Sequence, residues 1–181
     1  MKYIRLILIP IIALVIGITI SCERDDICAE STVTTPRLII DLYDIDDQES
    51  TKNAFNVVVF GFDNDDILSG YANVTTNSLV LPLKTDANTT QYVVHKDYSY
   101  DDNDTPDDVS DDIIGGNQDI LTINYSRELL YVSRACGYKT IFNNITVNIE
   151  SDSDNWLIST QDLTDNEPIE NENATHFNIF H

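Results

Sequence analysis

Residues 145–149 read Ile-Thr-Val-Asn-Ile, and residues 120–125 read Ile-Leu-Thr-Ile-Asn-Tyr. In both stretches apolar side chains alternate with mostly polar ones, so the apolar side chains share one face of an extended chain. This period of two predicts β-strands with one face in a core and the other toward solvent. No segment of the chain combines the period of an amphipathic helix with helix-capping residues, so the two stretches favour an all-β fold.

Strand signals recur outward from these two stretches in both directions. Residues 55–62 form a nearly continuous apolar run, as expected of a central strand that is buried on both faces. Pro82 places the segment 79–83 toward the edge of a sheet, because proline cannot donate a hydrogen bond to a neighbouring strand. The remaining expected strands cover residues 38–43, 91–95, 129–136, 156–158 and 177–179.

Clusters of Asp, Asn, Ser and Gly separate these segments and indicate turns. Gly115-Gly116-Asn117 is expected to form a hairpin turn or a hinge, and Arg127-Glu128 a short turn between two strands. About eight or nine short strands with such connections, and no helices to cross between parallel strands, predict an antiparallel β-sandwich of the immunoglobulin-like kind. The single tryptophan, Trp156, is expected in the core between the two sheets.

The first 22 residues have the form of an export signal. Lys2 and Arg5 precede a predominantly apolar run of 15 residues, Leu6–Ile20, and Cys22 follows shortly after it. The run is shorter than the roughly 20 apolar residues that a membrane-spanning helix needs. Its flanks match a signal peptide, and a cysteine at this position resembles a bacterial lipobox, in which the thiol is acylated and the chain is cleaved before it. A plain secretory signal with an unacylated Cys22 is the alternative.

This interpretation divides the chain into three parts. Residues 1–21 are expected to be a lipoprotein signal peptide, residues 22–35 a lipidated tether, and residues 36–181 a single sandwich domain with an acidic loop at 97–112. A chain of this length is one domain by the usual size of folding units. The predicted location is the bacterial cell envelope, with the lipid in the outer membrane and the face of that membrane left open.

Acidic side chains dominate the composition. The 181 residues include 31 Asp and Glu but only 10 Lys and Arg, for a formal charge of −21. Sequence-independent binding to nucleic acid requires clustered Lys and Arg, so the charge excludes that class of function. Anionic lipid surfaces are expected to repel the chain for the same reason, and its membrane contact is therefore expected through the N-terminal lipid.

The chain contains three cysteines. If Cys22 carries lipid, Cys28 and Cys136 remain, and two thiols of an exported chain most simply form one disulfide. The loop that they close spans about 108 residues and, by chain entropy alone, stabilises the fold by roughly 4–5 kcal/mol. Two buried free thiols, or a reactive Cys136 beside Arg134 and Lys139, are the alternatives.

The densest acidic cluster lies in residues 101–112. Its side-chain oxygen atoms suit a calcium ion, with Asp101, Asn103, Asp104 and Asp107 as candidate ligands. The order of residues does not fit an EF-hand loop, which needs glycine at its sixth position and glutamate at its twelfth. A solvated acidic loop without a bound ion is the alternative, and no other cofactor is expected.

No motif of a known enzyme class stands out. The three histidines, His95, His176 and His181, are expected to be ordinary polar or core residues. The sequence lacks a nucleophile elbow, a zinc-protease helix motif and a phosphate-binding loop. The chain is therefore expected to be a non-enzymatic binding or structural module. A calcium-dependent binder of glycan or protein is the second hypothesis, and a hydrolase built on two carboxylates is the third.

One segment carries a family resemblance. Residues 133–139, Ser-Arg-Ala-Cys-Gly-Tyr-Lys, together with Asp-Asp-Ile-Cys at 25–28, resemble Bacteroidota (flavobacterial-type) lipoproteins of unknown function. The resemblance extends over nearly the whole mature chain. It implies that the chain is exported as a lipoprotein, and it supports the pairing of Cys28 with Cys136. It implies no activity, because none is assigned to these proteins.

Overall fold

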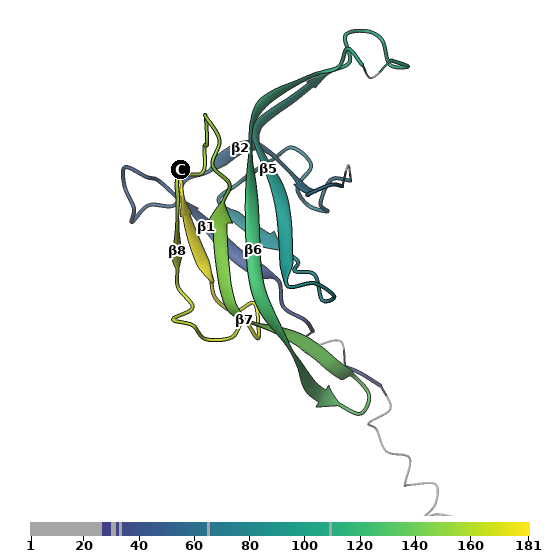
Figure 1. The fold of residues 1–181 in the computed structure, drawn as a ribbon, viewed down its shortest axis with the longest axis vertical. Coiled ribbons are helices and arrows are strands. Elements are labelled where there is room, and N and C mark those ends of the chain that lie inside the picture. The colour runs from purple at the N-terminus through teal and green to yellow at the C-terminus, as the bar shows by residue number, and fades with distance from the viewer. Residues whose placement is uncertain (1–26, 30–31, 33, 65, 109) are drawn as a thin grey trace, which may run out of the picture. The chain divides into compact units, whose positions relative to one another are not determined.

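The structure is a computed structural model that describes residues 27–29, 32, 34–64, 66–108 and 110–181. None of these residues lies in an α-helix, and nine β-strands run through them (Figure 1). The strands are β1 (Leu38–Tyr43), β2 (Ala54–Gly61), β3 (Val74–Thr76), β4 (Ser78–Leu81), β5 (Thr89–Asp101), β6 (Ile113–Ser133), β7 (Gly137–Ile149), β8 (Ser159–Asp162) and β9 (Phe177–Phe180). No segment of the described chain forms a helix long and apolar enough to cross a membrane.

The chain divides into two compact units. The larger unit comprises Val33–Leu129 and Thr140–His181. The smaller unit comprises the described residues up to Thr32 together with Leu130–Lys139. Strands β6 and β7 contribute residues to both units, because the turn that joins these strands belongs to the smaller one.

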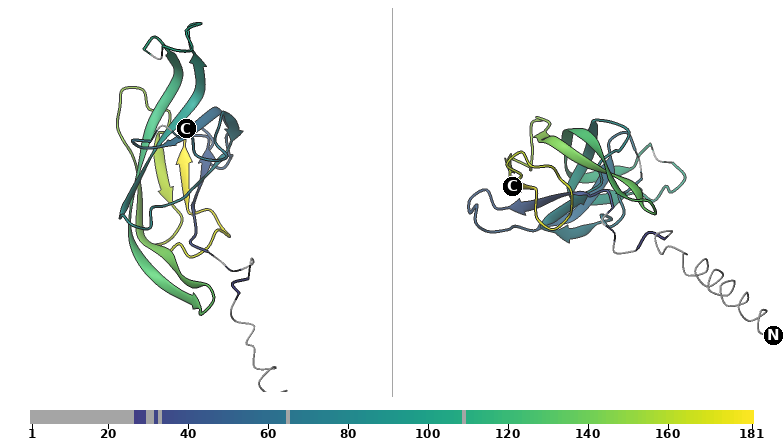
Figure 2. Two further views of the ribbon diagram at one scale, coloured as in Figure 1. Left: turned by 90° about the vertical axis from the view of Figure 1, so that its right-hand side faces the viewer. Right: turned by 90° about the horizontal axis from the view of Figure 1, so that it is seen from below.

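The larger unit is a sandwich of two β-sheets (Figure 2). One sheet has the strand order β4-β1-β9-β8, and the other has the order β3-β2-β5-β6-β7. The pairs β1–β4, β2–β3, β2–β5, β5–β6 and β8–β9 are antiparallel. Strands β1 and β9 instead pair in parallel, with Ile40 opposite Phe177. The predicted all-β, mainly antiparallel sandwich is confirmed, and β1–β9 is a parallel exception that the long connection between these strands permits.

One hydrophobic core contains side chains from both sheets. Leu38, Ile40 and Leu42 of β1 are fully buried, in the alternation that the sequence predicts. Trp156 is 8% exposed and belongs to the same core, as expected. Its indole N–H donates a hydrogen bond of 3.2 Å to the carbonyl of Val94, which satisfies the one polar atom of that side chain.

Strand β6 contradicts the turn expected at Arg127-Glu128 and the hairpin turn, one of two alternatives, expected at Gly115-Gly116-Asn117. It runs without interruption for 21 residues, so neither Gly115-Gly116-Asn117 nor Arg127-Glu128 reverses the chain. The register between β5 and β6 shifts once, between Lys96 and Ser99 on β5. Gly116 lies opposite this irregularity with φ at +104°, a backbone conformation that favours glycine. The glycines therefore permit an irregular stretch in a long hairpin, and the chain reverses farther out, in the acidic segment.

Strands β3 and β8 were not expected from the sequence. All four residues of β8 are exposed, so no alternation of apolar and polar side chains marks this strand. The expected strand at 156–158 is a connection that leads into β8. Trp156 and Leu157 are both buried although they are adjacent, which the two opposite faces of a surface strand do not allow.

Candidate functional site

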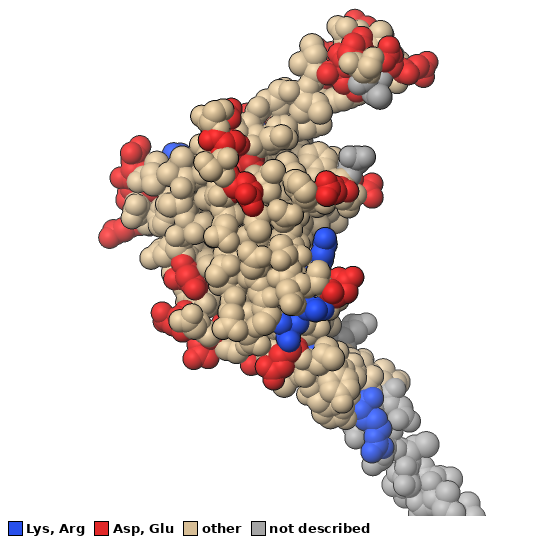
Figure 3. Space-filling view, viewed as in Figure 1, with Lys and Arg blue, Asp and Glu red and all other residues tan. Residues whose placement is uncertain are grey.

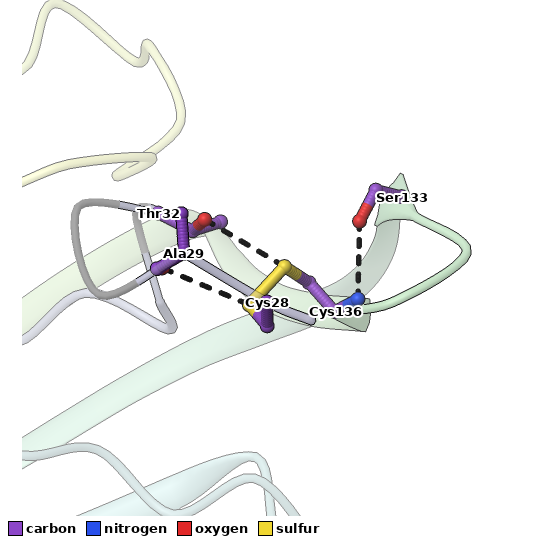
Figure 4. Close-up of a disulfide and its surroundings, with 5 residues drawn as sticks. All are labelled: Cys28, Ala29, Thr32, Ser133 and Cys136. Carbon is purple, nitrogen blue, oxygen red and sulfur yellow. Dashed lines mark hydrogen bonds between the residues drawn. A yellow bond between two sulfur atoms is a disulfide. The ribbon is translucent and has the colours of Figure 1, made fainter. Parts of the chain in front are cut away.

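A disulfide joins the N-terminal segment to the turn between β6 and β7 (Figure 4). The Cα atoms of Cys28 and Cys136 are 4.8 Å apart and their sulfur atoms are bonded. The backbone N–H of Cys136 donates to Ser133 Oγ at 3.0 Å, and the Thr32 hydroxyl lies 3.6 Å from Cys136 Sγ. The predicted pair is therefore bonded, and free thiols or a nucleophilic Cys136 do not describe this structure. The expected strand 129–136 ends at Ser133, so Cys136 lies in the turn.

The ends of β6 and β7 that flank this turn expose aromatic and aliphatic side chains. We call residues 130–139 together with Cys28 the stapled end. Tyr138 is 66% exposed, Tyr131 is 57% exposed and Leu130 is 37% exposed. The two tyrosine rings meet edge to face, with 5.4 Å between their centroids. The stapled end thus presents two large rings whose bodies are apolar and whose hydroxyl groups are polar.

Removing the disulfide should lower the free energy of unfolding by about 2 kcal/mol, less than the full loop length suggests. In the folded protein the backbone N–H of Thr140 donates to Thr35 Oγ1 at 3.0 Å, so both chain segments are already close together. In the unfolded chain the disulfide closes a loop of 108 residues. In the folded protein the disulfide closes a loop roughly ten times shorter, because the hydrogen bond between Thr140 and Thr35 already joins the two segments. Each doubling of loop length costs about 0.6 kcal/mol, so the difference between the two loops is about 2 kcal/mol.

Urea unfolding of the parent and of the double variant Cys28→Ser/Cys136→Ser measures this difference. Reduction of the parent by dithiothreitol is the matched control, because it breaks the same bond without a substitution. An unchanged unfolding midpoint in both cases would contradict the prediction.

The acidic loop is the end of the hairpin that β5 and β6 form. We call residues 97–116 the distal hairpin, and it extends beyond the rest of the larger unit (Figures 1 and 2). Eight of its residues are acidic, and acidic side chains gather at its tip (Figure 3). Three apolar or aromatic side chains of the distal hairpin are also more than half exposed: Tyr100, Ile113 and Ile114. The Tyr100 hydroxyl donates to Asp112 at 2.8 Å, and this hydrogen bond raises the pKa of Tyr100.

Two of the four candidate calcium ligands, Asp101 and Asn103, make hydrogen bonds within the acidic tip. Asp101 Oδ1 accepts a hydrogen bond from the backbone N–H of Asn103, and the Asn103 side-chain amide donates to Asp111 at 3.1 Å. Within the described ranges, no three His, Cys, Asp or Glu side chains are arranged to hold a metal ion. Hydrogen bonds to the Asp111 carboxylate, with the greatest effect from Asn103, lower the pKa of Asp111. The neighbouring acids therefore do not raise the pKa of this group. The site at Asp101, Asn103, Asp104 and Asp107 remains a prediction from the sequence.

Shortening the distal hairpin should leave the stability of the sandwich unchanged. Asp101 and Ile113 are the last paired residues of β5 and β6, so a two-residue Asn-Gly turn can replace residues 102–112. The described residues of that segment are partly or fully exposed and none belongs to the core. We therefore expect the free energy of unfolding to change by less than about 0.5 kcal/mol.

Urea unfolding of both proteins, with and without calcium, tests this prediction. A loss of more than about 1 kcal/mol would show that the tip supports the fold. A midpoint that rises with calcium in the parent and not in the shortened variant would establish the calcium site.

One hollow of the sandwich unit has a volume of about 600 Å³ and lies beside β2 and the start of β5. Phe62 and Tyr92 supply aromatic surface, and Asp63 and Asp66 supply carboxylates from one loop. Burial raises the pKa of Tyr92 to about 12, and its hydroxyl donates to the carbonyl of Pro82. The hydrogen of the Tyr92 hydroxyl therefore already has an acceptor within the fold and is not directed at a ligand.

A second hollow, of about 470 Å³, includes His95, Asp152 and Asp154 in its lining. The backbone N–H of Asp154 donates to Asp152 Oδ1 at 3.0 Å, so both carboxylates belong to one turn. A carboxylate hydrolase needs two carboxyl groups on opposite sides of the bond that it cleaves. Neither hollow has that arrangement among its lining residues.

Asp119 is a buried carboxylate that no sequence motif marks. It is fully buried, and its Oδ2 accepts a hydrogen bond of 2.7 Å from the backbone N–H of Leu157. Its Oδ1 has no hydrogen-bond partner in the described part of the chain. Burial raises the pKa of Asp119, and the hydrogen bond from Leu157 opposes that shift. The hydrogen bond from Leu157 ties β6 to the connection that carries Trp156.

Comparison with known proteins identifies one family. Residues 56–181, more than half of the chain, match the model of DUF6452, a family of unknown function. No curated protein and no solved structure matches the chain. The predicted signal peptide at 1–21 and the predicted lipidation residue, Cys22, lie outside both the match and the described residues.

Proposed function

We propose that this chain, which belongs to the DUF6452 family, is a lipid-anchored protein of the bacterial cell envelope that binds or supports other envelope components and catalyses no reaction. The family is of unknown function, so the proposal rests on the residues of this chain. A lipid on Cys22 would hold the sandwich at the outer membrane, and the proposal leaves the face of that membrane open.

The disulfide is the observation that carries the proposal. Structural disulfides persist in oxidising compartments such as the periplasm and the cell surface. The bond uses Cys28 and Cys136, which leaves Cys22 as the remaining cysteine of three. Cys22 follows closely on the apolar run Leu6–Ile20. An export signal, a disulfide and a cysteine at the expected cleavage position together support a lipoprotein.

A binding role is supported by the distal hairpin. Tyr100, Ile113 and Ile114 are exposed there beside many carboxylates. Apolar side chains that are ringed by charge are typical of surfaces that contact another protein. The negative charge favours a partner whose surface carries Lys and Arg. The lining of the two hollows, with carboxylates that share a loop, supports binding over hydrolysis.

Metabolic labelling with an alkyne-bearing fatty acid tests the anchor. We expect label on the parent chain and on the Cys28→Ser/Cys136→Ser variant, because both retain Cys22. The Cys22→Ser chain should carry no label and should leave the membrane pellet on fractionation. A parent chain without label, or a Cys22→Ser chain that keeps it, would overturn the proposed anchor.

A further inference from the structure

We propose that the stapled end lies against the lipid headgroups of the membrane into which Cys22 is anchored. This inference rests on the lipid anchor proposed above. It assigns the exposed side chains of the stapled end to one occupant, a phospholipid surface. The arguments come from the length of the tether, the side chains of the stapled end and their charge.

The tether is short. Cys28 follows Cys22 by six residues, and a fully extended chain of that length reaches at most about 20 Å. The disulfide transfers this limit to Cys136, because the Cα atoms of Cys28 and Cys136 are 4.8 Å apart. The turn that contains Cys136 therefore cannot lie far from the acyl chains, whatever path residues 23–27 take.

The exposed side chains suit the boundary between lipid and water. Tyr131 and Tyr138 are each more than half exposed, and their rings contact each other. Tyrosine is enriched at the headgroup level of membranes, where its ring contacts acyl chains and its hydroxyl remains hydrated. Leu130, next to Tyr131 on β6, adds aliphatic surface. While these rings are exposed to water, the protein does not gain the free energy that burial of their apolar surface would supply.

The charge of this segment differs from that of the rest of the chain. Residues 129–149 contain no Asp or Glu, although the whole chain has a formal charge of −21. Arg134 and Lys139 lie within the stapled end, and Arg134 is exposed. Cationic side chains next to exposed tyrosines complement lipid phosphates. The stapled end therefore adds no carboxylate to the repulsion expected between this acidic chain and anionic lipid, and the acids nearest to the lipid are Glu23, Asp25 and Asp26 of the tether.

Quenching by brominated lipid tests the contact on the full lipidated chain. The native Trp156 is buried in the core and supplies the background emission. Variant Tyr138→Trp places an indole on the stapled end. Variant Phe55→Trp is the matched control, because Phe55 is a 55% exposed aromatic residue on β2 of the larger unit. Each protein is reconstituted in phosphatidylcholine vesicles with and without bromine atoms near the top of the acyl chains.

We expect brominated lipid to reduce the emission added by Tyr138→Trp roughly twofold and to leave the emission added by Phe55→Trp unchanged. Mass spectrometry of the Cys22 peptide from the same samples separates the two proposals. If Cys22 is acylated and Tyr138→Trp is not quenched, the membrane contact is wrong and the lipid anchor stands. If Cys22 is not acylated, both are wrong.

Two other occupants would appear as distinct outcomes. Emission of Tyr138→Trp that changes with protein density at constant lipid, without quenching by bromine, would assign the surface to a second copy and overturn the proposal. Equal quenching of Tyr138→Trp and Phe55→Trp would show non-specific adsorption of the chain and would also overturn it.

Discussion

Replacing Phe142 by alanine should lower the free energy of unfolding by about 3–5 kcal/mol, the largest single-site effect that we expect. The Phe142 side chain is fully buried in the core, and its ring meets that of Tyr125 edge to face at 5.0 Å. The backbone of Phe142 also exchanges hydrogen bonds with Ile169, so the surrounding chain cannot collapse freely into the cavity. A cavity that cannot close makes the loss larger.

The matched control is Phe55→Ala, because Phe55 is the same residue type with 55% of its surface exposed. We expect that variant to lose less than about 1 kcal/mol, since little apolar surface returns to water. Equilibrium unfolding in urea measures both. Equal losses at the two positions would contradict the assignment of Phe142 to the core.

Lowering the pH from about 7 to about 5 should destabilise the sandwich. Burial lowers the pKa of His95, His176 and His181 in the folded protein from the ordinary value of 6.5. Each of these side chains therefore binds fewer protons folded than unfolded in the range between its folded pKa and 6.5. The stabilising contribution is complete above about pH 6.5 and is lost as pH falls through the folded pKa, at up to about 1.4 kcal/mol per pH unit for each histidine.

His176 shows the physical reason most directly. Its Nδ1 accepts a hydrogen bond of 2.9 Å from the backbone N–H of Ile39, so its Nε2 carries the proton and donates to the carbonyl of Asn171 at 3.2 Å. Protonation would place a second N–H opposite the N–H of Ile39. Asp119 acts in the opposite direction, because its raised pKa contributes stability that is lost as the pH rises.

The variant His176→Asn separates the contribution of one histidine. The asparagine Oδ1 retains an acceptor for the N–H of Ile39 but does not titrate. Unfolding midpoints measured across this pH range should fall about one third less steeply for the variant than for the parent. A parent whose stability is flat between these pH values, or a variant with the same slope, would contradict the prediction.

Side-chain alternation predicted the strands that have one face in the core, and it failed where burial does not alternate. β1 and the middle of β6 were found because every second residue there is buried. β8 was missed because all four residues are exposed and the strand is defined by its backbone pairing with β9. The expected turn at Arg127-Glu128 was wrong because residues 127–131 are all exposed, so the pattern stops while the strand continues.

The candidate sites also divide into those that the sequence predicts and those that it does not. The disulfide followed from counting three cysteines and assigning one to lipid. The buried Asp119 had no local signal, because its hydrogen-bond donor, the backbone N–H of Leu157, lies 38 positions away. The contact between Tyr131 and Tyr138 likewise depends on the length of the turn that joins β6 and β7. Pairing across strands, rather than local composition, determines these features.

The parallel pairing of β1 and β9 has a consequence for the nascent chain. Ile39 and His176, which are hydrogen-bonded to each other beside this pair, are 137 residues apart, so β1 is synthesised long before β9 is present. Until then the Leu-Ile-Ile-Asp-Leu-Tyr segment of β1 has an open edge that invites pairing with other chains. Folding that waits for such distant contacts is slow and exposed to aggregation. A chain that stalls before β9 should therefore depend on chaperones far more than the finished protein.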